Sequence, residues 1–148
     1  SMRGKLESLS SIYKESKNNW FLMTPRFNKE KFLCFYASDA FILCSDSEAL
    51  PMSPLEAMST GLFCLLSKEC NLNDFVNQKL ALGIEKNEVK FKQSLLKLIY
   101  QSPIERDNLK IPIINYLKKN YSKEVIGEKY MELYSWIYDR NSKPDFIF

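Results

Sequence analysis

The fold of this chain is decided by residues 40–61, which read AFILCSDSEALPMSPLEAMSTG. Residues 40–44 are a short apolar run, typical of a parallel strand that is buried on both faces. Ser53, Pro54 and Glu56 then predict an N-cap, a first-turn proline and a capping-box glutamate for a helix that starts at Pro54. A buried strand that turns into a helix predicts an α/β fold, with a ligand site at the carboxyl end of the strand that favours anions.

Two carboxylates flank this turn: Glu48 lies on the loop and Glu56 in the helix, with seven residues between them. Both can accept hydrogen bonds from hydroxyl groups on either side of a phosphate, which is the outline of a nucleotide sugar. A purely structural interpretation stays open for each acid. Glu56 would then only close a capping box with Ser53, and Glu48 would be a solvated loop acid.

The pair Glu48-x7-Glu56 is followed by AMSTG at residues 57–61 and preceded by YASD at residues 36–39. This pattern resembles the donor-binding half of a GT-B, retaining glycosyltransferase of family four, and the similarity extends over roughly residues 5–138. The resemblance implies an α/β fold with a Rossmann-like parallel sheet and flanking helices, in which the family's strand order is 3-2-1-4-5-6.

The same resemblance implies roles for the residues of the turn. Glu56 would bind the ribose hydroxyls of the nucleotide, and Glu48 would be the catalytic residue that contacts the donor sugar near its reacting carbon. The loop would bind the diphosphate and sugar hydroxyls through backbone amides, of which its prolines have none. These further substrate-binding residues are Leu50, Pro51, Met52 and Ser53. No metal or other cofactor is implied, and the nucleotide-sugar donor, expected to be UDP-linked, is a substrate.

The expected domain organisation follows from the family's sheet, because this chain would start after the first two strands. Residues 1–148 would be an N-terminally truncated, partial C-terminal domain, with residues 1–2 as an expression scar. An absent N-terminal domain would hold the acceptor, so the chain alone is expected to transfer no sugar. The family's basic residues that neutralise the diphosphate would lie in the missing part. Exposed strand edges predict self-association through residues 4–25.

Three departures from the family pattern keep a second class open. Ala49 stands where the family has glycine, Phe63 stands where it has proline, and residues 68–71 replace a Gly-Gly loop. The alternative is a non-catalytic α/β ligand-binding or interaction module, in which Glu48 and Glu56 are structural. Protection of the protein by a nucleotide against thermal unfolding separates the two classes.

Composition excludes several other classes. The chain has 148 residues and 45% hydrophobic content, which is enough for one domain. Its formal charge is only +3, and its basic residues alternate with acidic ones, so we expect no nucleic-acid partner. It has four cysteines without C-x-x-C spacing and no histidine, so neither a zinc site nor a histidine triad is expected. Asp46 and Glu48 are interpreted as hydrated acids rather than metal ligands.

The cysteines and the apolar runs together predict a cellular location. Cysteines in apolar surroundings indicate reduced thiols in a cytoplasmic protein. The longest apolar stretch, residues 32–44, is interrupted by Asp39 and too short to span a bilayer, and no signal peptide precedes it. We therefore expect no integral membrane segment and a cytoplasmic location, which allows peripheral association of the intact protein with the inner membrane face.

Strands and helices are expected to alternate along the chain. The predicted strands are residues 20–23, 40–45, 63–67 and 80–84, and the predicted helices are residues 4–15, 29–37, 54–60 and 73–78. Gly61 is expected to be the left-handed C-cap of the helix at 54–60. A further helix around residues 91–99 is stopped by Pro103, and helical segments are expected at 113–119 and 126–137.

Overall fold

The computed structural model of the chain describes residues 23–140 and 142–146. The chain divides into two units, residues 1–31 and 32–148. The first unit is described from Met23 onward, where an ion pair joins Arg26 to Glu30 at 3.1 Å. The helix predicted at 4–15, nearly all of the strand at 20–23 and most of the predicted association region lie outside the described residues; Met23 itself is not in a strand.

The described elements alternate between helix and strand as far as residue 100, as predicted, and two further helices follow. They are α2 (Asn28–Tyr36), β1 (Phe41–Leu43), α3 (Met52–Ser59), β2 (Cys64–Ser67), the 3-10 turn η1 (Lys68–Cys70), α4 (Asn73–Asn77), β3 (Ala81–Ile84), α5 (Glu88–Tyr100), α6 (Pro103–Tyr121) and α7 (Lys123–Asp139). The predicted strands at 40–45, 63–67 and 80–84 are slightly longer than β1, β2 and β3, because an apolar residue also stands just before each observed strand.

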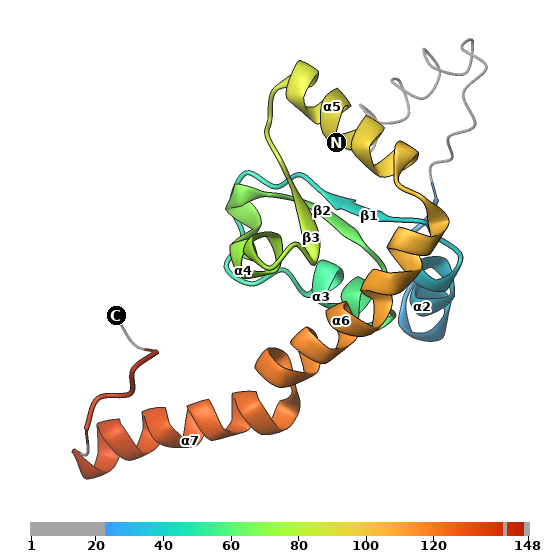
Figure 1. Ribbon diagram of the computed structural model, residues 1–148. Helices are drawn as coiled ribbons and strands as arrows, with labels where there is room; N and C mark the ends of the chain where they lie inside the picture. The colour runs from blue at the N-terminus through green and yellow to red at the C-terminus, as the bar shows by residue number, and fades with distance from the viewer. Residues whose placement is uncertain (1–22, 141, 147–148) are drawn as a thin grey trace. The chain divides into compact units, whose positions relative to one another are not determined.

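The described part of the chain forms one parallel sheet of three strands in the order β1-β2-β3. Phe41 pairs with Cys64 and Cys64 with Ala81, so β2 is central, and all four of its residues are buried. Figure 1 shows α3 and α4 on one side of the sheet and α5 on the other. The α/β fold class with a parallel sheet and flanking helices is therefore confirmed.

The core lies between the sheet and these helices. Its largest fully buried side chains include Met58 of α3, Leu65 and Leu66 of β2, Phe75 of α4 and Ile113 of α6. Residues from these four elements thus share one apolar cluster, in which each fully buried side chain contributes roughly 1.5–3 kcal/mol.

Helix α6 begins at Pro103 rather than at Ile113, so the predicted segment at 113–119 is too short. A capping box starts it: Glu105 N–H donates to the hydroxyl of Ser102 at 3.2 Å, and Ser102 N–H donates to the Glu105 carboxylate at 2.9 Å. Pro103 ends the preceding helix, as predicted, and also supplies the first residue of the next one.

Helix α7 follows α6 and contacts it, and it covers the stripe predicted at 126–137. None of its residues is buried. None of the helices in the described ranges is long and apolar enough to cross a lipid bilayer.

Candidate functional site

The carboxyl ends of the strands meet at one edge of the sheet, because all three strands are parallel. The loop after β1, residues 44–51, carries Asp46 and Glu48. The turn η1 after β2 carries Glu69, and Lys86 follows the end of β3 by two residues. This carboxyl edge is the place where the sequence predicted a ligand.

Ser67, at the end of β2, joins β2 to the β1 loop. Its hydroxyl accepts a hydrogen bond from Ser45 N–H at 3.1 Å and donates one to the Ser45 carbonyl at 3.0 Å. Only 2% of Ser67 is exposed, so both bonds are shielded from water. These bonds continue the connection of the two strands past Leu43, the last β1 residue in the ladder.

Glu48 is held at three points by the ends of β1 and β2. Its N–H donates to the Glu69 carbonyl at 3.0 Å, and its own carbonyl accepts a hydrogen bond from the Asn71 side chain. Its Oε1 accepts a hydrogen bond from the Ser45 hydroxyl at 2.8 Å. The half-buried Glu48 carboxylate therefore has a fixed position, a property that electrostatic stabilisation of a reacting group requires.

Lys86 bridges two acids at this edge. Its Nζ lies 2.8 Å from Asp46 Oδ1 and 3.4 Å from Glu69 Oε2. The hydrogen bond to Lys86, followed by its charge, lowers the pKa of Asp46, and the bond to Asp46 is the main cause that raises the pKa of Lys86. The pKa of Glu69 is lowered first by a hydrogen bond to its own backbone and then by Lys86. All three groups are therefore charged at neutral pH.

The start of α3 differs from the prediction. The helix begins at Met52, and Pro51 occupies the N-cap with φ −73° and ψ 118° and no side-chain cap hydrogen bond. Ser53 is therefore the second helical residue, and its predicted role as N-cap is wrong. The fixed φ of Pro51 suits the residue just before a helix. Pro54 is tolerated in the first turn, because N–H groups there have no hydrogen-bond partner within the helix. The helix can therefore start before Pro54.

This start changes the interpretation of Glu56. A capping box needs the serine at the N-cap, so Ser53 and Glu56 do not form one, and that structural alternative is removed. Glu56 lies half-buried in the second turn of α3. In the first positions of this helix only Met52 and Ser53 have an N–H, since Pro51 and Pro54 have none.

Of the other predicted loop residues, Leu50 and Pro51 lie in the loop, whereas Met52 is the first residue of α3. Leu50 and Met52 are exposed, at 48% and 61%, and Pro51 is buried. Lys86 was not predicted as a site residue, because it follows β3 whereas the predicted site residues all follow β1. The only signal in the sequence was its position just past the predicted strand at 80–84. Within the described ranges, no three cysteine or acidic side chains are grouped to hold a metal ion.

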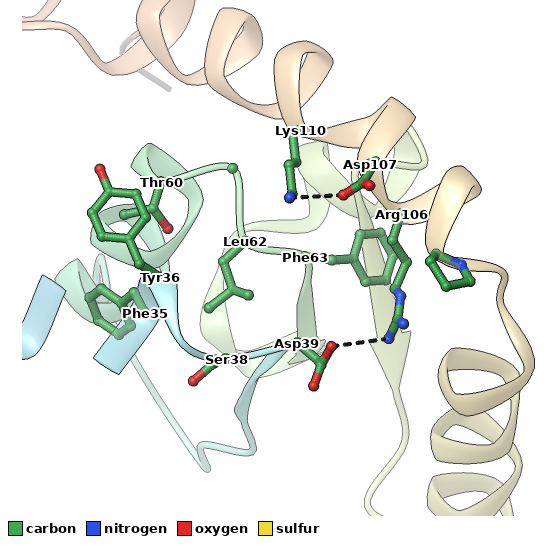
Figure 2. Close-up of a pocket in the computed structure, with 12 residues that line it drawn as sticks. Phe35, Tyr36, Ser38, Asp39, Thr60, Leu62, Phe63, Arg106, Asp107 and Lys110 are labelled. Carbon is green, nitrogen blue, oxygen red and sulfur yellow. Dashed lines mark ion pairs between the residues drawn. The ribbon is translucent and has the colours of Figure 1, made fainter. Parts of the chain in front are cut away.

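A pocket of about 190 Å³ lies at the opposite edge of the sheet, where β1 and β2 begin. Figure 2 shows Arg106 reaching from α6 toward Asp39, at 3.8 Å, and Lys110 paired with Asp107 of the same helix, at 2.8 Å. Phe63 forms part of the apolar lining. The four charges cancel in pairs, so this pocket presents no net charge to an ionic ligand, and it was not predicted from the sequence.

Residues 4–112 match the family model described as Glycosyl transferases group 1, which covers well over half of the chain. No curated protein matches the chain.

Proposed function

The chain belongs to the group 1 glycosyl transferases, whose chemistry is the transfer of a sugar, and on that premise we propose that its carboxyl edge binds a nucleotide-sugar donor. The observation that carries the proposal is the fixation of Glu48 by Ser45, Glu69 and Asn71 at the edge where an α/β sheet binds ligands. The proposed reaction is a retaining transfer of the family-four type, from a UDP-linked sugar to an acceptor.

Glu48 is proposed as the catalytic residue. Its carboxylate is placed before any ligand arrives, so it can stabilise positive charge that develops on the donor sugar without reorganising. One of its oxygens accepts from Ser45, and the other, Oε2, has no hydrogen-bond donor among residues 23–140 and 142–146. That oxygen is available to the sugar.

Glu56 is proposed as the ribose ligand. A carboxylate that accepts hydrogen bonds from two ribose hydroxyls gains roughly 1.5–3 kcal/mol for each bond before desolvation. The N–H groups of Met52 and Ser53 lie at the positive end of α3, beside Leu50 and Pro51, and are proposed to bind the diphosphate. The ribose and the phosphates would then lie along the first two turns of one helix.

The acceptor is proposed to bind a further, N-terminal domain, as the two-domain GT-B arrangement implies. The 148-residue chain would then bind the donor but transfer no sugar by itself. We propose a cytoplasmic protein, since activated sugar nucleotides are the substrates.

Titration calorimetry with UDP on the 148-residue chain tests the proposal. Glu56→Gln keeps the side-chain size but removes the charge, so UDP affinity should fall about tenfold, equivalent to ~1.4 kcal/mol. Glu48→Ala should change UDP affinity less than about twofold, because Glu48 serves the sugar end of the donor. Glu128→Gln on α7, an exposed glutamate outside the site, is the matched control.

Two outcomes would contradict the proposal. Equal affinity of the Glu56→Gln variant and the wild-type chain would remove Glu56 from the site. No binding of UDP by the wild-type chain would favour the alternative, a non-catalytic α/β module in which both acids are structural.

A further inference from the structure

Lys86 connects the ends of all three strands at the carboxyl edge. It follows β3, and it reaches Asp46 in the β1 loop and Glu69 after β2. We propose that Lys86 is a positioning residue of the donor site, which holds the loop that carries Glu48 and offsets part of the negative charge of the two acids beside it. The inference rests on the proposed function, because it assigns the charge balance of the same site.

Lys86 pairs with residues on two sides of Glu48 but not with Glu48 itself. Asp46 lies two residues before Glu48 in the same loop, and the Glu69 carbonyl accepts the Glu48 N–H. Holding Asp46 and Glu69 therefore restrains Glu48 from the loop side and from the β2 side. The side chains of Lys86 and Glu69 are 33% and 42% exposed, whereas Asp46 is fully exposed, so the contact with Glu69 is the better shielded of the two.

The charges at this edge require a cation. A diphosphate is an anion, and Asp46, Glu48 and Glu69 would together repel it. Lys86 shares its charge between two of these acids, which leaves Glu48 as the acid with no cation on it among the described residues. The sequence alone assigned no basic residue to this edge, and Lys86 fills that place.

Hydrogen exchange of the Glu48 amide measures the positioning role without any nucleotide. Lys86→Met should make this amide exchange about three- to fivefold faster, since exposed ion pairs contribute only up to about 1 kcal/mol each. Lys86→Arg should restore slow exchange. Lys90→Met is the matched control, because Lys90 also carries an ion pair, with Glu85 at 2.5 Å, but does not contact the loop. Unchanged exchange in Lys86→Met would overturn the positioning role.

UDP affinity measures the charge role. Lys86→Met should weaken UDP binding about fivefold, and adding Asp46→Asn and Glu69→Gln to that variant should restore it, because the acids that needed compensation are gone. A triple variant that stays weak would overturn the charge role and indicate direct contact of Lys86 with phosphate. If the wild-type chain does not bind UDP, the proposed function fails, whereas the exchange experiment still decides whether Lys86 positions Glu48.

Discussion

At the scale of single residues, Ser67 has the strongest consequence for the site. Its hydroxyl satisfies both the N–H and the carbonyl of Ser45, and its Oγ also lies 3.5 Å from the Cys70 thiol. Ser45 in turn donates to the Glu48 carboxylate. A buried hydroxyl at the end of one strand therefore orients an acid that follows another strand.

Ser67→Ala should lower the free energy of unfolding by about 1–3 kcal/mol, because the backbone groups of Ser45 lose their partner while remaining partly buried. Urea denaturation followed by circular dichroism measures this change. Ser59→Ala is the control, since the Ser59 hydroxyl bonds only its own helix at an exposed position, and it should stay within about 0.5 kcal/mol of wild type. Equal effects of the two variants would contradict the role of Ser67.

At the scale of elements, Gly61 allows α6 to pack closely against the end of α3. It follows the end of α3 with φ +78°, as predicted for a left-handed cap, and its N–H donates to the Met58 carbonyl at 2.9 Å. A Cβ added there would lie 3.0 Å from the Cβ of Lys110 and 3.3 Å from its Cα. Glycine is thus required both for the backbone conformation and for the close approach of α6.

Gly61→Ala should destabilise the fold by about 2 kcal/mol or more, the left-handed backbone alone costing about 1–2 kcal/mol. Gly127→Ala is the matched control, because Gly127 lies inside α7 with no atom within 4 Å of an added Cβ. That variant should stabilise the chain by about 0.5–1 kcal/mol through helix propensity. Thermal unfolding of both variants checks the opposite signs, and a shift of the same sign in both would refute the argument.

At the scale of the whole molecule, the buried Cys64 thiol and the half-buried Tyr121 hydroxyl couple stability to alkaline pH. Burial raises the pKa of the Cys64 thiol from 9.0 to about 12. Burial, followed by the hydrogen bond to Asp74 and the charge of that acid, raises the pKa of Tyr121. The Tyr121 hydroxyl donates to Asp74 at 2.9 Å, and its ring stacks on Phe75, so this tyrosine also ties α6 to α4.

Stability should therefore be constant near neutral pH and fall above about pH 9, because these groups lose their protons in the unfolded chain first. Between its pKa in the unfolded chain and its pKa in the folded chain, each such group lowers the free energy of unfolding by up to about 1.4 kcal/mol per pH unit. Urea denaturation at several pH values measures the slope. Tyr121→Phe should make the decline shallower, although its stability at neutral pH is lower, while Tyr138→Phe, an exposed control on α7, should leave the slope unchanged. An identical slope in both variants would exclude Tyr121 as a source.

Local signals in the sequence were sufficient for several elements. The apolar run that forms β1 and the cap at Gly61 each depend on residues within a few positions of one another. The capping box at Ser102 and Glu105 is equally local, although the start of α6 was not predicted from it. The start of α3 was misplaced because two prolines, at 51 and 54, both fit a helix start, and only the folded chain shows which one precedes it.

The sequence by itself determined the parallel α/β class, the place of Glu48 and Glu56 on one strand-to-helix turn, and the family resemblance. The tertiary structure alone decided what holds that turn: the partners of Ser45 and Asp46 are Ser67 and Lys86, which lie 22 and 40 residues away along the chain. Hydrophobic period, caps and turns act within a few residues, whereas these hydrogen bonds and ion pairs exist only once parallel strands bring their carboxyl ends to the same edge.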